Sequence, residues 1–324
     1  MTENIFVNEV EQRPDLSVKI AGINFKNPVI AASGTFGYGS EYAQLFDVSL
    51  LGGICTKALT LIPRTGNTGI RIWETPCGLL NSIGLENPGI RSFLENELPR
   101  LSQMGPVIIA NLSGAEADEY INGASLLNDS GVDMIELNIS CPNVKAGGLA
   151  FGLDPGTAAS LTAAVRRVCR NTPLMVKLSP NAPSLSAVAL ACVKAGADAL
   201  SLVNTFRAMA IDIEKRKPVF DGIIAGLSGP AIRPIALRMV WELFDALKES
   251  RAQVPIVGIG GISCTNDAVE FLMAGAAAFQ VGSATFVNPH TMADIIDGLQ
   301  QYMKNKGISK LGDISIREIY GKNN

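Results

Sequence analysis

"AGADALSLVN" (195–204) joins the end of a predicted helix to the start of a predicted strand. A glycine that can end a helix is followed by a small or acidic residue and then by an apolar run. The same joint recurs in "SGVDMIELN" (130–138) and "AGAAAFQVG" (274–282). A repeated helix-to-strand joint is typical of βα units, whose strands lie parallel in one sheet.

Similar apolar runs mark the strands of such a sheet. Eight are found, at 28–33, 52–57, 106–112, 133–139, 173–179, 198–204, 255–261 and 278–283. Amphipathic helices are predicted between them, for example at 116–129, 156–170 and 231–250. This alternation predicts an α/β fold, a (β/α)8 TIM barrel, with residues 1–324 forming a single domain.

The connections outside this pattern are also informative. "LSVKIAGINFKNP" (16–28) alternates like a short N-terminal hairpin, which we expect to close the barrel floor. Long loops are predicted after strands two, four and six, and those after strands two and six run over about 58–90 and 205–230. Loops that follow barrel strands lie at the face where barrel enzymes place their active sites.

Composition excludes several classes of function. The chain has 324 residues, 47% of them hydrophobic and 18% charged, and a net charge of −3 without a Lys/Arg block, so nucleic-acid binding is not expected. Its longest apolar runs have strand length, so no membrane helix is expected. The polar, acidic start "MTENIFVNEVEQRPDL" lacks the features of a secretory signal, and we expect a cytoplasmic protein.

The cysteines and the histidine argue against metal sites. The six cysteines (55, 77, 141, 169, 192 and 264) are scattered without a C-x-x-C pair, and His290 is the only histidine. A disulfide framework, a metal site, an iron–sulfur cluster in this chain and a Ser–His triad are therefore not expected.

Polar residues and glycines gather at the predicted strand ends. They are Ser33, Lys57, Asn111, Asn138, Lys177, Asn204, Gly260, Gly261, Gly282 and Ser283. Any one of them alone would more often be a turn residue or a solvated side chain. Together they predict one polar mouth at the carboxyl end of the barrel.

Glycines dominate the ends of the last two strands. "GIGGIS" (258–263) ends strand seven and "VGSATF" (281–286) ends strand eight, where this fold commonly binds phosphate. Ser263 breaks the G-x-G-x-x-G pattern of dinucleotide sites. We therefore expect a single phosphate, as on a mononucleotide, with Gly229 as a possible third contact.

Two lysines and four asparagines have more than one interpretation. Lys177 lies in the apolar run "LMVKLS" and is either a lysine at the rim or a cation facing a cofactor ring that gains negative charge. Lys57 would bind a carboxylate or the same ring. The amides of Asn81, Asn138, Asn143 and Asn204 suit a small ring with alternating C=O and N–H groups, or they bond to nearby backbone.

Cys141 is either a small buried side chain or a reactive thiol. Pro142 ends the strand beside it, and Asn138 and Asn143 flank it. For Cys55, Cys169 and Cys192, which lie in apolar patterns, we expect plain burial.

These motifs together resemble one family. "NSIGLEN" (81–87), "NISCPN" (138–143), "VNT" (203–205), "GIGGIS" and "VGS" resemble the class 1 dihydroorotate dehydrogenases, FMN-containing barrels of pyrimidine biosynthesis. The likeness covers roughly residues 18–300 in a consistent order. "NVKAGGLAFG" (143–152) resembles class 1B, whose catalytic chain has a partner subunit with FAD and a 2Fe–2S cluster and passes electrons to NAD. Class 1A, which uses fumarate, is matched less well.

The resemblance implies an activity and a partner. It implies oxidation of dihydroorotate to orotate, with a hydride passing to one FMN per chain and Cys141 removing a proton. It also implies a homodimeric core within a heterotetramer. Two other classes stay open: a lyase or isomerase barrel that binds phosphate without flavin, and a non-catalytic paralogue that binds partners.

The resemblance also assigns residues to the two ligands. Those implied to hold FMN are Ser33, Lys57, Ala58, Asn111, Asn138, Lys177, Val203, Gly229, Gly260, Gly261, Gly282 and Ser283. Those implied to surround the substrate are Lys57, Asn81, Ser82, Ile83, Gly84, Leu85, Asn138, Asn143, Asn204 and Thr205.

Overall fold

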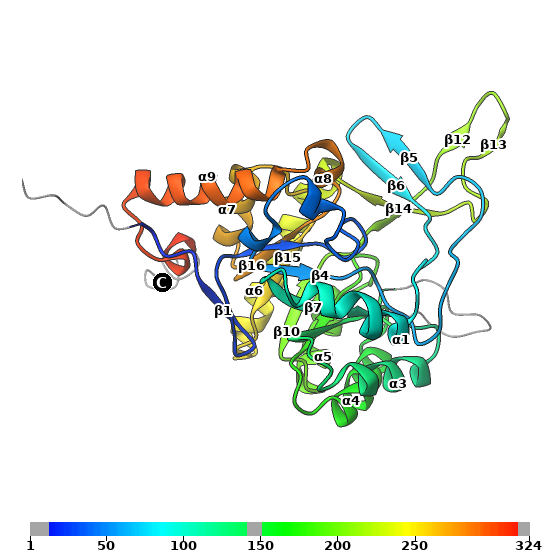
Figure 1. Cartoon of the computed structure of the whole chain (residues 1–324), viewed down its shortest axis with the longest axis horizontal. Coiled ribbons are helices and arrows are strands. Elements are labelled where there is room, and N and C mark those ends of the chain that lie inside the picture. Colours follow the sequence, from blue (N-terminus) through cyan, green and yellow to red (C-terminus); the bar gives the residue numbers. More distant parts are fainter. Residues whose placement is uncertain (1–12, 141–150, 317–324) are drawn as a thin grey trace, which may run out of the picture.

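A closed barrel of eight parallel strands forms the centre of the protein (Figure 1). The computed structural model describes residues 13–140 and 151–316. The barrel strands are β3 (Val29–Ala31), β4 (Gly53–Cys55), β7 (Val107–Leu112), β8 (Met134–Asn138), β9 (Leu174–Lys177), β10 (Ala199–Leu202), β15 (Ile256–Ile259) and β16 (Ala278–Val281). Each lies within one of the eight predicted runs, so the predicted barrel is confirmed.

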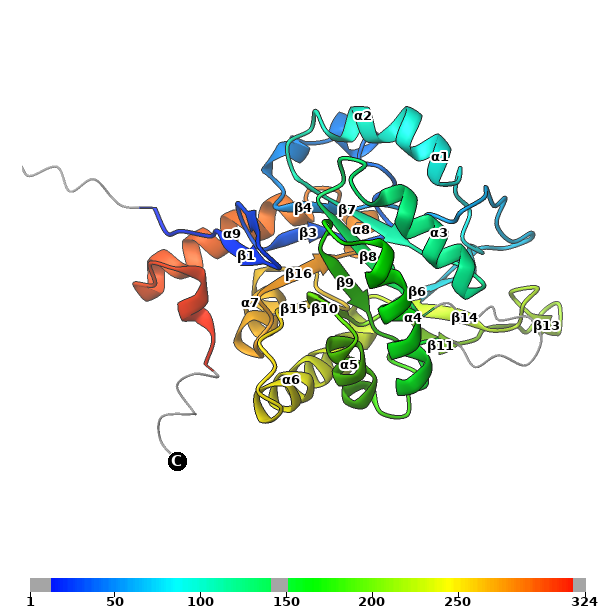
Figure 2. The same cartoon turned by 90° about the horizontal axis from the view of Figure 1, so that it is seen from below.

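Helices surround the strands (Figure 2). They are α1 (Ile90–Ser92), α2 (Leu98–Leu101), α3 (Ala117–Leu127), α4 (Pro155–Val168), α5 (Leu185–Lys194), α6 (Arg233–Glu249), α7 (Thr265–Met273), α8 (Ala284–Val287) and α9 (Thr291–Lys306). Capping residues mark where several of these helices begin or end. Asp154 and Ser184 cap α4 and α5 by accepting hydrogen bonds from Thr157 N and Ala187 N, and Gly307 ends α9 with a φ of 64°.

The repeated joints behave as the sequence predicts. Gly131, Gly196 and Gly275 have φ values of 101°, 104° and 107°, which favour glycine. Each follows a helix or its terminal turn and precedes β8, β10 or β16. Parallel strands with helices on one side and the barrel interior on the other are buried on both faces. In agreement, Val107 is the one residue of the eight described strands that is not buried.

An antiparallel hairpin closes the barrel floor, as predicted. It consists of β1 (Val18–Ile20) and β2 (Ile23–Phe25). Ile20 and Phe25, which are 0% and 1% exposed, pack in one cluster with inward-facing side chains from the barrel strands. That cluster contains Ile30, Cys55, Ile109, Met134, Met175, Ala199, Val257 and Ala278. The floor is therefore a mostly apolar layer that includes the Cys55 thiol.

The two long connections are not plain loops. The first contains β5 (Ile72–Thr75) and β6 (Gly78–Asn81), and the second contains β11 (Phe206–Ala208), β12 (Ile211–Asp212), β13 (Lys217–Pro218) and β14 (Ala225–Ser228). β11, β14, β6 and β5 pair in that order into an antiparallel sheet, which Figure 1 places away from the β1–β2 hairpin. The prediction of loops there was incomplete, because this sheet depends on pairing between distant segments.

Two further predictions have a limited outcome. Most of the long connection predicted after strand four, residues 141–150, lies outside the described residues. The single domain over residues 1–324 stays a prediction. Among the helices that the structure describes, none has both the length and the apolar character needed to cross a membrane.

Candidate active site

A carboxylate lies at the centre of the barrel's polar layer. Side chains along β8 alternate, so Met134 and Glu136 face the interior while Ile135 and Leu137 pack against the helices. Glu136 is fully buried. Its Oε1 accepts hydrogen bonds from Ser201 Oγ at 2.8 Å and Gln280 Nε2 at 2.6 Å.

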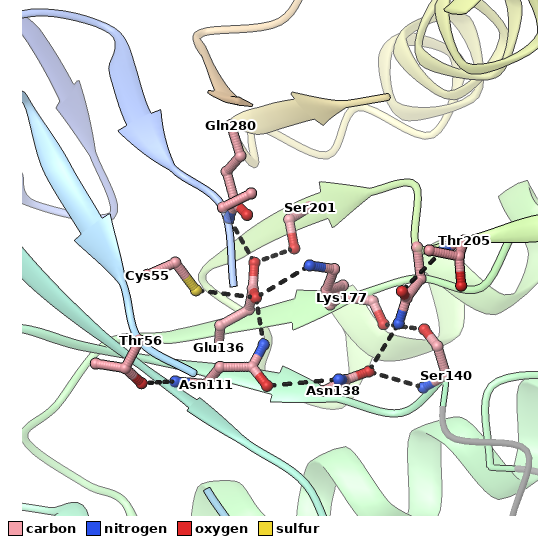
Figure 3. Close-up of polar contacts among 12 residues, drawn as sticks. Cys55, Thr56, Asn111, Glu136, Asn138, Ser140, Lys177, Ser201, Thr205 and Gln280 are labelled. Atoms are coloured by element: carbon pink, nitrogen blue, oxygen red, sulfur yellow. Dashed lines mark hydrogen bonds and ion pairs between the residues drawn. The ribbon is translucent and has the colours of Figure 1, made fainter. Parts of the chain in front are cut away.

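The other carboxylate oxygen of Glu136, Oε2, also has several polar partners. Glu136 Oε2 accepts hydrogen bonds from Asn111 Nδ2 at 2.5 Å and Cys55 Sγ at 3.1 Å, and Lys177 Nζ lies 3.6 Å away (Figure 3). Burial alone would raise the pKa of the Glu136 carboxyl. The Lys177 charge and the hydrogen bonds from neighbouring side chains outweigh burial and leave that pKa below its usual range. Glu136 is therefore an anion at neutral pH.

Lys177 is not a rim lysine. It ends β9, is 5% exposed and extends into the barrel toward Glu136 (Figure 3). Its burial excludes the interpretation as a lysine at the rim, and its role toward a cofactor ring stays a prediction. A lysine is buried in this way only when it is paired.

A chain of amides rises from Glu136 toward the mouth. Asn138 Nδ2 donates to Asn111 Oδ1 at 3.4 Å, and Asn204 Nδ2 donates to Asn138 Oδ1 at 3.2 Å. The backbone N–H of Thr205 donates to Asn204 Oδ1 at 2.8 Å. Four predicted site residues are thus brought together. The carboxyl ends of β7, β8 and β10 contribute one amide side chain each.

Glycines form a narrow cradle beside this chain. A Cβ on Gly261 would lie 2.7 Å from the carbonyl oxygen of Gly229, and one on Gly229 would lie 3.5 Å from Ser283 Oγ. A Cβ on Gly260 would lie 2.6 Å from Ala236 Cβ and 3.4 Å from Val203 Cγ2. All three glycines have positive φ values, between 71° and 136°. The backbones that follow β14, β15 and β16 therefore approach one another too closely for side chains at these positions, and glycine-rich backbone of this kind presents N–H groups that suit a phosphate.

The first long connection places its own polar residues at the mouth. Asn81 Nδ2 donates to the Gly226 carbonyl at 3.1 Å, and a Cβ on Gly226 would lie 2.3 Å from Thr205 Oγ1. Asn81 therefore lies beside Thr205, although 124 positions separate them in the sequence (205 minus 81).

The segment that follows Asn81 is held by hydrogen bonds. Ser82 accepts from Asn67 Nδ2 through Oγ at 3.0 Å, and the Ile83 carbonyl accepts from Asn67 N at 2.9 Å. Gly84 and Leu85 continue it with φ values of 77° and 57°. The predicted substrate segment thus has a defined backbone conformation.

Lys57 is the second predicted cation. It follows β4, is partly buried, and its backbone N–H donates to the Gly37 carbonyl at 3.0 Å. Burial lowers the pKa of its ammonium; the charge of Glu86 partly opposes this effect, and that of Arg71 adds to it. A ligand carboxylate would supply the negative charge that offsets this lowering.

The remaining predicted residues have simpler outcomes. Ser33 lies two residues after the end of β3, Ala58 three residues after the end of β4, and Gly282 directly after β16, at the same end of the barrel. Within the described part of the chain, no hydrogen bond joins Ser33 or Ala58 to the Glu136 cluster. Cys141 and Asn143 lie outside the described residues.

Comparison with known proteins identifies the family. The family model for dihydroorotate dehydrogenase matches residues 15–303. The chain belongs to the dihydroorotate dehydrogenase family. The family resemblance predicted from its motifs is thereby confirmed.

Curated dihydroorotate dehydrogenase relatives match nearly the whole chain. The catalytic subunit of dihydroorotate dehydrogenase B (NAD(+)) from Petrotoga mobilis is 57% identical over 300 residues, which are 93% of this chain and 98% of that protein. The subunit of the same name from Caldicellulosiruptor saccharolyticus is 49% identical over 310 residues, covering 96% and 99%. That from Thermoanaerobacter pseudethanolicus is 48% identical, covering 93% and 97%. These names agree with the predicted class 1B and not with class 1A.

Sequence reasoning missed the polar layer of this dihydroorotate dehydrogenase fold. Glu136, Ser201 and Gln280 lie in apolar runs and were not singled out. Cys55 is buried as predicted, but its thiol also donates to Glu136. A usable signal was present: these side chains occupy inward-facing positions of their strands, where an apolar interior offers a polar group no other partner.

Proposed function

We propose that this chain is the catalytic subunit that oxidises dihydroorotate to orotate in pyrimidine biosynthesis, with FMN held in the barrel mouth. The observation that carries the proposal is the meeting of a buried cation, an amide chain and a three-glycine cradle at one barrel end. The cradle suits the phosphate of FMN, and Lys177 suits its ring. FMN, when bound, accepts the hydride that leaves dihydroorotate.

Different residues of the chain bind the phosphate and the ring of FMN. Gly229, Gly260, Gly261, Gly282 and Ser283 hold the phosphate through backbone N–H groups and a hydroxyl. Lys177 places a positive charge where the ring gains negative charge. Residues from five other strand ends complete the site: Ser33, Lys57, Ala58, Asn111, Asn138 and Val203.

Substrate recognition falls to amides and one cation. The amide groups of Asn81, Asn138, Asn143 and Asn204 match the alternating donors and acceptors of the pyrimidine ring. Lys57 pairs with the carboxylate of the substrate. The segment Ser82–Leu85 and Thr205 supply further polar contacts, and the hydrogen bonds of Asn67 keep that segment in place.

Proton removal is assigned to Cys141. The thiolate is the reactive form of cysteine, and an ordinary thiol has a pKa of ~8.5. The thiolate removes a proton from the carbon next to the one that loses the hydride, and so becomes the thiol. Unless the site lowers the pKa of this thiol, turnover rises with pH up to about that value.

The proposal includes an electron-transfer partner. The relatives are named as catalytic subunits of an NAD(+) enzyme, which implies another subunit in those proteins. We propose a partner with FAD and a 2Fe–2S cluster, bound to a homodimer of this chain in a heterotetramer. We propose that the protein is cytoplasmic. The five cysteines in the described residues are free thiols, which a reducing compartment preserves.

The cofactor assignment has a direct test. The purified chain should be yellow and, on denaturation, release FMN in about a one-to-one molar ratio with protein, measured by absorbance and mass spectrometry. Gly261→Val should lower that ratio, because even its Cβ would lie 2.7 Å from the Gly229 carbonyl oxygen. A colourless wild-type protein that takes up no added FMN would favour a barrel without flavin.

A further inference from the structure

The hydrogen bonds around Glu136 leave it no capacity for another donor. An ionised carboxylate has about four lone-pair sites. Ser201 and Gln280 occupy those of Oε1, and Asn111 and Cys55 occupy those of Oε2. Donors from four different strands thus fill both oxygens.

Lys177 therefore neutralises Glu136 without bonding to it. Its Nζ lies 3.6 Å from Oε2, beyond an ordinary hydrogen bond but close enough for a strong charge interaction. Within the described residues, no hydrogen bond has Lys177 Nζ as its donor. The ammonium is thus charge-balanced by a neighbour while its three N–H groups stay available at the base of the mouth.

The charge states of the groups around this pair are settled by their surroundings. Burial, and next the negative charge of Glu136, raise the pKa of Cys55 well above its ordinary value, so Cys55 is a neutral thiol that donates. Asn111, Ser201 and Gln280 are neutral at any pH of interest. The pair of Glu136 and Lys177 is the local source of charge among the described residues of this layer.

The Glu136 carboxylate also fixes the orientation of the Gln280 side-chain amide. Its Nε2 donates to Glu136, and its Oε1 is buried without a partner in the structure described. A buried acceptor without a partner is unfavourable. The carboxylate therefore determines which way this amide points, because an anion can only accept.

We propose that Glu136 is a positioning residue that acts through Lys177: it supplies the counter-charge that holds the ammonium in the barrel, while its saturated oxygens leave the ammonium's N–H groups to the bound ring. This inference rests on the proposed function for the identity of that ring. The inference goes beyond the proposed function, because it assigns the counter-charge of Lys177 to Glu136, a residue that need not touch the ligand.

The negative charge of Glu136 should have a measurable effect on the redox potential of the bound flavin. A reduced flavin ring that carries negative charge is attracted by Lys177 and repelled by Glu136. Glu136→Gln keeps the size of the side chain and removes the repulsion. We expect the variant to favour the reduced over the oxidised flavin by about tenfold more than the wild type does, which for a two-electron couple is about 30 mV upward.

The experiment is an equilibrium redox titration of the FMN-loaded chain with a reference dye. Glu119→Gln is the matched control, because Glu119 also pairs with a cation, Arg64, at 3.3 Å, but lies on α3 outside the barrel interior. The control should leave the potential unchanged. A Glu136→Gln chain that loads FMN fully and keeps the wild-type potential would overturn the inference.

A second variant covers the case in which Glu136→Gln does not fold. Ser201→Ala removes one donor from Oε1 and keeps the carboxylate. A carboxylate with one hydrogen bond fewer presents more negative charge to Lys177, so we expect a shift of the potential in the opposite direction, downward. An unchanged or raised potential in this variant would count against Glu136 as the counter-charge.

A ligand-free measurement separates this inference from the proposed function. In the flavin-free chain, Glu136→Gln and Lys177→Met each leave one buried charge without its partner, whereas the double variant leaves none. Denaturant unfolding should therefore show each single variant to be less stable than the double variant. Additive losses would overturn the pairing, whether or not the chain binds FMN, while a wild-type chain without flavin would overturn the proposed function alone.

Discussion

Replacing Cys141 with alanine is expected to slow the reduction of the bound flavin by dihydroorotate roughly 10²–10⁴-fold, the usual contribution of a positioned general base. The protein should stay folded and yellow, because the proposed FMN site consists of other residues. The backbone just before Cys141 is tied to the site. Ser140 N donates to Asn138 Oδ1 at 3.3 Å, and Ser140 Oγ donates to the Lys177 carbonyl at 3.2 Å.

Stopped-flow bleaching of the flavin absorbance measures this effect. Cys77→Ala is the matched control, since Cys77 is an exposed thiol between β5 and β6 and should bleach at the wild-type rate. Cys141→Ser should regain activity only at high pH, because a hydroxyl is a far weaker acid than a thiol. Near-normal bleaching in Cys141→Ala would mean that another group removes the proton.

The isolated chain is expected to form essentially no NADH from dihydroorotate and NAD, although it should reduce an artificial acceptor. Three features lead to this expectation. The sequence has no G-x-G-x-x-G between a strand and a helix. In the described residues, no group of three or more cysteine, histidine or acidic side chains is arranged to hold a metal. The barrel mouth is proposed to hold FMN with the substrate on it, so a nicotinamide would compete with the substrate.

Absorbance of NADH in an anaerobic assay tests the electron route. Adding the partner subunit with FAD and a 2Fe–2S cluster should start NADH formation, which serves as the positive control. Robust NADH formation by the chain alone would contradict the proposed route. Turnover with fumarate that the partner does not increase would instead favour the class 1A activity.

The barrel could be predicted because its signals are local. Apolar runs of strand length mark the eight barrel strands, and the glycines at 131, 196 and 275 mark the joints that precede three of those strands. The strand ends then bring their polar residues to one mouth by the geometry of the fold alone. Fold and most of the mouth thus follow from short segments.

The rest depends on contacts between distant segments. Gly226 pairs with Asn81 across the sheet of β14 and β6, and nothing near either residue signals this register. The Glu136 cluster combines single polar side chains from several apolar strands, each of which looks incidental by itself. Lys177 had two interpretations from its sequence: its burial beside Glu136 excludes a lysine at the rim, and the cofactor ring that it would face stays a prediction.

Anaerobic titration of the purified wild-type chain with dihydroorotate tests the central claim most directly. The account predicts that the oxidised flavin absorbance disappears as about an equal molar amount of dihydroorotate is added, and that orotate appears in the same amount. A chain that contains FMN, keeps its oxidised spectrum and forms no orotate with excess dihydroorotate would contradict it.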